Sequence, residues 1–447
     1  MEDLWVGCAA GGSGDRVDAA RPIVAAMVKA GKRGVLIFEN LAERTLAFAQ
    51  LAKRANPDAG YEPLLDEEVR PVLGDCLRHG IAIVSNFGGA NPRGAAAHIL
   101  RIAEQLGLPR PRIAVIEGDD LSDPRGQALL RPLLPPASVE RQFVSANVYQ
   151  GAFEIADALK AGAQVVVTGR VADPSLTLGP AIAHFNWARD DCDRLAGATM
   201  AGHLLECGAQ VTGGYFADPG FKNVPDLADV GYPIAEIAAD GSCVITKPPG
   251  TGGLVDVRNV KEQLLYELHD PAAYLTPDVV ADITGVELDQ AGTDRVRMTG
   301  VRGHPRPATL KALAYFEGGW LGEAEISYSG PNAEARARLA MDIVAKRMGP
   351  RFHIRFDLIG SCSILGDDAG EMRAATGSRG LEDVRLRAAG KHDSQAEIER
   401  LLREVYSLWL CGPAGGGGVR VARRQRLSNV ACLVPRELVP ATFHFVS

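Results

Sequence analysis

The stretch Leu4-Trp5-Val6-Gly7-Cys8-Ala9, followed by the turn Gly11-Gly12-Ser13-Gly14-Asp15, sets the pattern for the first half of the chain. A short apolar run leads into a turn rich in Gly, Asn or Asp, and the turn leads into a stretch of helical periodicity. The apolar run recurs at residues 34–38, 81–85, 112–116, 143–148 and 164–167. Strands that alternate with helices predict a parallel sheet covered on both faces. We therefore expect an α/β fold with a doubly wound, mostly parallel sheet of the Rossmann type.

The pattern changes after about residue 225. Short β-like runs at 234–237, 243–246, 295–298, 310–316 and 325–329 now alternate with helical stretches at about 260–268 and 333–347. This predicts two domains. Residues 1–225 would form the Rossmann-like domain with most of the candidate site loops, and residues 226–447 an α+β domain with Gly-rich loops. Residues 366–395 are polar and Gly-rich, as is typical of a linker or a mobile segment.

Composition and charge narrow the class of protein. The 447 residues carry a net charge of -7, and the only short basic run is Arg423-Arg424-Gln425-Arg426, which argues against a nucleic-acid partner. No stretch reaches the roughly 18 apolar residues that a membrane span needs. The eight Cys include no C-x-x-C pair, which favours a reducing compartment over a zinc knuckle or a redox dithiol. We expect a cytoplasmic homo-oligomer with no membrane partner. No spacing of residues fixes a metal site, and the cofactor stays unknown.

Ligands of open α/β sheets bind beyond the carboxyl ends of the strands, so polar residues there are candidates for the site. In the first turn, the backbone amides of Gly12, Ser13 and Gly14 favour a carboxylate or phosphate at the start of the following helix. Asp15 and Arg16 complete this candidate anion site, and Arg16 adds a donor fork. The alternative is a tight strand-to-helix turn with Asp15 as the N-cap.

Further turns supply more candidates for substrate binding. Arg170 at the mouth of a buried strand is costly unless it faces an anion, so it either clamps a substrate carboxylate or pairs with Asp173. Asn86 can bond a carbonyl or a carboxylate. The remaining candidates are Arg93, beside the helix start Asn91-Pro92, and two residues of late Gly clusters, Gly252 and Gly416. These clusters indicate either ligand contact or a mobile lid.

Three residues are candidates for proton transfer. Glu39 ends a predicted strand and could act as a general acid or base. His203 and Glu206 stand at i and i+3 on one helix face, where they could act as a base and the group that orients it; the alternative is a hydrogen-bonded core histidine. The sequence has no G-x-S-x-G, H-E-x-x-H or Walker A motif, which excludes the corresponding hydrolases, zinc proteases and nucleotide kinases.

Together these motifs resemble the acyclic terpene utilisation family, AtuA type. The blocks that carry the resemblance span nearly the whole chain: Gly14-Asp15-Arg16, Glu39-Asn40-Leu41-Ala42-Glu43-Arg44-Thr45, Ala90-Asn91-Pro92-Arg93, Thr168-Gly169-Arg170-Val171-Ala172-Asp173-Pro174-Ser175, Gly202-His203-Leu204-Leu205-Glu206-Cys207-Gly208 and Lys261-Glu262-Gln263-Leu264-Leu265-Tyr266-Glu267. The resemblance implies a place in the breakdown of acyclic terpenes as acyl-CoA thioesters. It also implies that a small C-terminal domain, present in many relatives, is here encoded separately.

These observations predict a catabolic enzyme acting on a small anionic metabolite, either a carboxylate or an acyl-CoA thioester. Hydration, dehydration or lyase chemistry fits best, with Glu39 or the His203–Glu206 pair moving protons and Arg16 and Arg170 holding the anion. One alternative is a non-catalytic accessory subunit of an acyl-CoA-processing complex. A Rossmann-like dehydrogenase is a weaker alternative, because the first turn lacks the G-x-G-x-x-G spacing.

Overall fold

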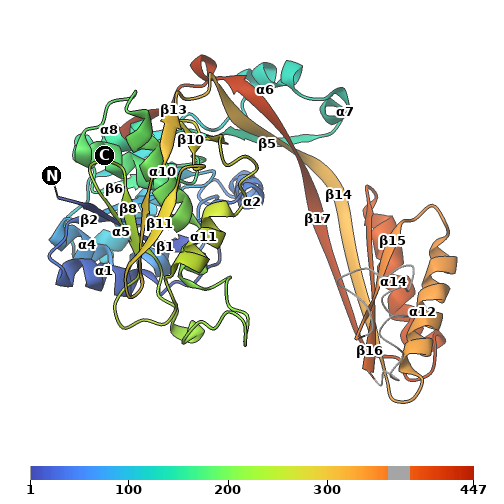
Figure 1. The fold of residues 1–447 in the computed structure, drawn as a ribbon. Coiled ribbons are helices and arrows are strands. Elements are labelled where there is room, and N and C mark those ends of the chain that lie inside the picture. The colour runs from blue at the N-terminus through green and yellow to red at the C-terminus, as the bar shows by residue number, and fades with distance from the viewer. Residues whose placement is uncertain (1, 361–382, 447) are drawn as a thin grey trace. The chain divides into compact units, whose positions relative to one another are not determined.

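The computed structural model describes residues 2–360 and 383–446, which fall into two compact units (Figure 1). The first unit comprises Met1–Glu140, Val144–Ala314 and Val430–Ser447. The second comprises Arg141–Phe143 and Tyr315–Asn429. The domain boundary predicted near residue 225 lies inside the first unit, because strands from both sides of it join one sheet. None of the helices in the described residues is both long and apolar enough to cross a membrane.

The centre of the first unit is a run of five parallel strands, each close to a predicted run. In spatial order they are β1 (Leu4–Gly11), β2 (Gly34–Glu39), β3 (Ala82–Ser85), β6 (Val165–Val167) and β4 (Ile113–Glu117). β-Branched and other apolar residues dominate these strands, and most of them are buried. Continuous apolar runs are typical of strands covered on both faces.

Antiparallel strands extend this parallel core on both sides. Beyond β1 lie β7 (Ile234–Ile237), β8 (Cys243–Thr246), β12 (Arg295–Thr299) and β11 (Glu287–Gly292), and β18 (Thr442–Phe445) pairs with β4. The predicted α/β class is therefore confirmed, but the sheet is mixed, and the fold is not a clear doubly wound Rossmann fold. One physical reason is that β7 and β8, and likewise β11 and β12, are joined by short turns and so form antiparallel hairpins rather than crossovers.

Helices cover both faces of the sheet. On one face, α1 (Ala20–Lys29), α4 (Leu73–His79) and α5 (Pro92–Gln105) pack against alternate strand residues such as Leu36 and Ile83. On the other face, α8 (Phe153–Lys160), α9 (Ser175–Phe185) and α10 (Cys192–Glu206) pack against Val35 and Val166. Successive strand residues point to opposite faces, so each strand contributes side chains to both cores.

The remaining elements of the first unit connect or flank these layers. They are α2 (Glu43–Ala55), α3 (Leu65–Val69), α6 (Pro124–Leu130), α7 (Pro136–Val139), β5 (Phe143–Val148), α11 (Val257–Leu265), and the small sheet of β9 (Tyr274–Leu275), β10 (Val280–Asp282) and β13 (Arg302–His304). As the sequence predicts, α5 begins at the Asn91-Pro92 pair, where the Asn91 side chain accepts a hydrogen bond from the amide of Gly94.

In the part of the second unit that the structure describes, a sheet is covered by two helices. Its strands lie in the order β15 (Ile354–Ile359), β16 (Asp383–His392), β14 (Thr309–Ser329) and β17 (Gly417–Pro435). Helices α12 (Ala333–Met348) and α14 (Gln395–Cys411) share a buried core with the sheet (Figure 1). The two runs predicted at 310–316 and 325–329 belong to one strand, β14. The predicted linker at 366–395 lies partly outside the described residues, and its remainder forms β16 and the start of α14.

Candidate functional site

The candidate site lies at a switch point of the parallel sheet. Strands β3 and β6 are neighbours, but β3 leads to α5 on one face whereas β6 leads to α9 on the other. Such a divergence opens a crevice beyond the carboxyl ends of the two strands. Glu39 ends β2, Asn86 follows β3 and Arg170 follows β6. The Ser85 hydroxyl donates a hydrogen bond to the carbonyl of Phe38 at 2.6 Å and so ties two of these strand ends together.

Glu39 is a buried carboxyl group held by one of its oxygens. Its Oε1 accepts hydrogen bonds from Asn86 Nδ2 at 2.7 Å and from the Leu41 amide at 3.1 Å. Burial raises the pKa of Glu39 to about 8; the negative charge of Asp173 adds to this shift, and Arg170 opposes it. Glu39 therefore carries a proton at neutral pH and is placed to act as a general acid.

Arg170 is the buried cation of the site, with a side chain only 3% exposed. Its Nη2 lies 2.8 Å from Oδ1 of Asp173, and its Nη1 donates to the carbonyl of Leu41. The guanidinium stacks on the ring of Tyr149 at 4.1 Å. Asp173 is one-third exposed, so it is the more accessible member of the pair. The pairing of Arg170 with Asp173 leaves the role of Arg170 as a substrate clamp a prediction.

Three residues of this network were not singled out from the sequence. The Tyr149 hydroxyl donates to Glu43 Oε1 at 2.7 Å, and Lys311 Nζ lies 2.7 Å from the same oxygen. Asp119 accepts a hydrogen bond from the backbone amide of Arg170 at 2.8 Å. Asp119 and Tyr149 do follow predicted strands, so their position at strand ends was a usable signal. Lys311 lies far along the chain, and no local pattern indicates its role.

The first Gly-rich turn is held by its own polar groups. Asp15 accepts hydrogen bonds from the amides of Gly11 at 2.9 Å and Arg16 at 2.7 Å. Arg16 pairs with Asp18 at 2.9 Å. Because α1 begins only at Ala20, Asp15 is not its N-cap, and the amides of residues 12–14 are not in its first turn.

The glycines of this turn differ in their surroundings. A Cβ on Gly11 would lie 2.4 Å from the carbonyl carbon of Cys207, so this glycine permits the close approach of β1 to the end of α10. Gly12 and Gly14 have open space where a Cβ would be, and Gly14 has a φ of 85°. Ser13 lines a cavity described below.

His203 and Glu206 contact each other on α10, as their spacing predicts. His203 Nδ1 lies 3.1 Å from Glu206 Oε1, and Nε2 lies 3.1 Å from the carbonyl oxygen of Gln263. Burial raises the pKa of Glu206 to about 7, and Glu206 in turn raises the pKa of His203. Both His203 partners can accept a hydrogen bond, which favours a proton on each ring nitrogen of His203. The negative charge of Asp173 also raises the pKa of Glu206, which links the pair electrostatically to the Glu39 network.

The other three candidates have local partners. Arg93 forms an exposed ion pair with Glu117 at 2.6 Å. A Cβ on Gly252 would lie 1.9 Å from the carbonyl oxygen of Asp226, which indicates a close backbone approach. Gly416 belongs to the second unit, where a Cβ would lie 2.9 Å from Ile326. Direct contacts thus join Glu39 to Asn86 and Arg170 to Asp173, and the backbone of Leu41 bonds to both Glu39 and Arg170, while these three residues contact others.

Two cavities of the first unit adjoin the Glu39 network. One, here called the α2 cavity, has a volume of about 470 Å³. Its walls include Ser13, Asn40, Leu41, Phe48, Tyr61 and Asn86. The other, here called the Tyr149 cavity, has a volume of about 480 Å³, and its walls include Tyr149, Asp173, Leu275, Leu310, Lys311 and Leu433. Both volumes suit a small molecule. The walls of the α2 cavity include residues that hydrogen-bond to Glu39. The walls of the Tyr149 cavity include residues that contact Arg170.

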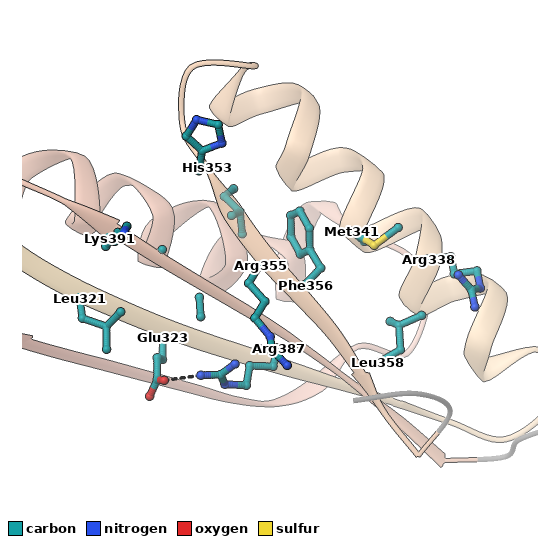
Figure 2. A pocket seen from close by; sticks show the side chains of 13 residues that line it. Leu321, Glu323, Arg338, Met341, His353, Arg355, Phe356, Leu358, Arg387 and Lys391 are labelled. Carbon is teal, nitrogen blue, oxygen red and sulfur yellow. Dashed lines mark hydrogen bonds and ion pairs between the residues drawn. The ribbon is translucent and has the colours of Figure 1, made fainter. Parts of the chain in front are cut away.

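A larger cavity of about 930 Å³ lies in the second unit (Figure 2). Figure 2 shows Arg355, Arg387 and Lys391 among its lining residues, together with Phe356. Arg387 is paired with Glu323 and with Asp357, so its charge is already balanced. The acid–base groups described above do not line this cavity. In the described ranges, 2–360 and 383–446, no cluster of three or more His, Cys, Asp and Glu side chains could hold a metal ion.

Comparison with known families supplies the identity that the geometry alone does not give. The family model for acyclic terpene utilisation proteins of the AtuA type matches residues 4–445. The chain belongs to this family. Membership in the AtuA family supports a role in acyclic terpene utilisation and confirms the resemblance drawn from the sequence. A comparison with curated proteins finds no match.

Proposed function

We propose that this AtuA-family protein is an enzyme that uses Glu39 as a general acid–base group on a small carboxylate or an acyl-CoA thioester. Hydration, dehydration or lyase-type chemistry is the reaction class, because each of these steps moves a proton to or from oxygen or carbon. The observation that carries the proposal is the placement of Glu39, a buried carboxyl group held through Oε1 whose pKa burial raises to about 8. No described residue is bonded to Oε2, which leaves that oxygen to exchange the proton.

Arg170 and Asp173 support this proposal. In a dehydration, Glu39 would give its proton to the departing hydroxyl group, which leaves as water. A second group must then accept the proton from the neighbouring carbon. Asp173 is the accessible carboxylate nearest to the buried cation, and burial raises its pKa, which makes it a stronger base than an ordinary aspartate. Arg170 fixes the position of Asp173 and keeps the charge of the site balanced.

Incubation of the purified protein with hydroxylated and unsaturated acyl-CoA thioesters and branched carboxylic acids, with products identified by mass spectrometry, tests the proposal. Positioned acid–base groups contribute roughly 10²- to 10⁴-fold to a rate, so Glu39→Gln should lower kcat/KM by about that factor. Arg78→Ala, in an exposed ion pair with Asp75 away from the candidate residues, is the control and should leave the rate unchanged. Wild-type kcat/KM in Glu39→Gln would refute the role of Glu39. No turnover of any compound by the wild type would favour the accessory-subunit hypothesis.

A further inference from the structure

The two cavities beside the Glu39 network differ in how polar groups are distributed over their walls. In the α2 cavity, polar side chains are scattered: Ser13, Asn40, Arg44, Glu62 and Asn86 all line it. In the Tyr149 cavity, the charged side chains are Asp173 and Lys311, and the hydroxyl of Tyr149 faces Glu43. The rest of that wall is largely aliphatic. The Tyr149 cavity therefore has a charged end at Asp173 and Lys311 and a largely aliphatic remainder, in which Thr276 and Thr309 are the polar exceptions.

The apolar part of the Tyr149 cavity is contributed by rigid or partly exposed residues. Pro277 and Leu310 are buried, while Leu275 and Leu433 are 68% and 62% exposed. Both leucines line the same cavity, and exposed aliphatic side chains grouped on a cavity wall are typical of a ligand-binding groove. A hydrocarbon chain entering the cavity would remove both from water. Prolines in the wall would keep its shape without further ordering when a ligand binds.

The charged end of this cavity is continuous with the catalytic network. Asp173 is paired with Arg170, and Tyr149 is stacked between Arg170 at 4.1 Å and Lys311 Nζ at 4.9 Å. Lys311 is 47% exposed, so its ammonium group is accessible to an incoming anion even though it also contacts Glu43. A molecule with an aliphatic chain and an anionic or thioester end would therefore place that end beside Asp173, and Asp173 lies close enough to Glu39 to raise its pKa.

We propose that the Tyr149 cavity is the binding site for the aliphatic chain of an acyl substrate, with the carboxylate or thioester end at Lys311 and Asp173. This inference rests on the proposed function, because it names the substrate class of the same site. It makes Leu275 and Leu433 specificity-determining residues. Affinity should then rise with chain length, by about fourfold for each methylene group that enters the cavity.

Calorimetric titration with straight and branched carboxylic acids of roughly four to ten carbons, a size range chosen to suit a pocket of this class, tests the assignment. Leu275→Ser and Leu433→Ser should each flatten the dependence of affinity on chain length, and because both side chains are exposed, neither change should impair folding. Leu106→Ser, at a 41% exposed leucine outside the cavity, is the matched control. Ala52→Trp fills the α2 cavity instead and should leave the dependence intact. Loss of the dependence in Ala52→Trp but not in the leucine variants would overturn the assignment.

Cys432 gives a second readout, because it lines the Tyr149 cavity and is half-buried. A bound chain should slow modification of Cys432 by methyl methanethiosulfonate at least tenfold at saturation, while exposed Cys411 of the second unit should react at the same rate as before. Unchanged modification of Cys432 by saturating acid would overturn the proposal. The measurement also separates the two proposals, since Glu39→Gln should retain the protection even if Glu39 proves not to be catalytic. The CoA thioesters of the same acids distinguish a free-acid ligand from a thioester.

Discussion

At the residue scale, the candidate site contains buried charged groups of opposite sign that balance one another. Arg170 is one buried cation, and Glu39 and Asp173 are two carboxyl groups near it. If both carboxyl groups were ionised, a buried excess of negative charge would result, and burial of an unpaired charge is costly. A protonated Glu39 leaves one cation facing one anion. The raised pKa of Glu39 thus follows from the same contacts that place it beside the cavities.

The raised pKa of Glu39 has a consequence for stability. The folded state holds the proton up to a pKa of about 8, whereas the unfolded chain loses it near 4.5. Stability from this group is therefore fully present below pH 4.5 and is lost as pH rises toward 8. Glu39→Gln should lie within about 1 kcal/mol of the wild type at pH 5 and exceed it at pH 8.5 by about 4–5 kcal/mol, as urea unfolding at the two pH values can show. An equal difference at both pH values would contradict the shifted pKa.

Removal of the buried cation should also destabilise the folded protein strongly. Arg170→Ala leaves Asp173, a carboxylate that is one-third exposed, without its partner, which should cost about 2–4 kcal/mol in the free energy of unfolding. The control is Arg93→Ala, which breaks an exposed pair with Glu117 and should cost less than about 1 kcal/mol. Both variants can be compared by urea denaturation at pH 7. If the two losses were equal, the Arg170–Asp173 pair could not be the organising contact of the site.

At the element scale, the approach of α10 to β1 positions the His203–Glu206 pair. The sequence predicts that glycines of the first turn allow close approach to a ligand, but at Gly11 the structure uses the absent side chain for the backbone of Cys207. His203 then reaches the carbonyl of Gln263, so α10 is connected to α11. One backbone contact, between Gly11 and Cys207, thus fixes the end of β1 against the end of α10.

Gly11→Ala tests this contact. The added methyl group would meet backbone atoms at 2.4 to 2.7 Å, and backbone cannot move aside as a flexible side chain can. We expect a loss of about 1–3 kcal/mol in stability, and a wider separation of β1 from α10. Gly12→Ala, next along the chain with open space at its Cβ, should change stability by less than about 0.5 kcal/mol. Thermal unfolding of both variants would decide, and equal melting temperatures would rule out the contact.

Most strands and helices could be predicted because they follow from local periodicity. The pairing of strands could not, because β7 returns to lie beside β1 more than two hundred residues later. The 21-residue strand β14 also escaped prediction, since Gly318 and Gly319 interrupt its apolar pattern. Gly319 even has a φ of 74°, and tertiary pairing keeps the strand continuous across it.

The candidate site could likewise be predicted only where it follows from local sequence. Glu39, Asn86 and Arg170 could be found because each ends or follows a local apolar run, and polar residues at strand ends gather at one edge of a parallel sheet. Lys311 could not, because it reaches the site through a contact with Tyr149 that is set by tertiary structure. His203 and Glu206 could be paired from their spacing, but not with Gln263 on another helix.

At the scale of the whole molecule, the second unit interrupts the first in sequence. Residues 315–429 separate Ala314 from Val430, and both borders fall within long strands, β14 and β17. A change of composition marks most domain borders, but a border inside a strand has none. For this reason the sequence suggested a boundary at the change of pattern near residue 225, which lies inside the first unit. Each unit nevertheless has its own buried core.

Because the two units have separate cores, we expect them to unfold separately. Ile99 lies in a core of the first unit and Leu386 in that of the second, and both are fully buried. Calorimetry of the full chain should resolve two transitions, because cooperativity follows a shared core. Ile99→Ala and Leu386→Ala should each destabilise its own unit by about 2–5 kcal/mol, and each should lower only one of the two melting temperatures.

A carboxylic acid that binds the Tyr149 cavity should raise the melting temperature that Ile99→Ala lowers and leave the other unchanged, since a ligand stabilises only the unit that binds it. A single transition that both substitutions shift equally would mean that the two units unfold as one.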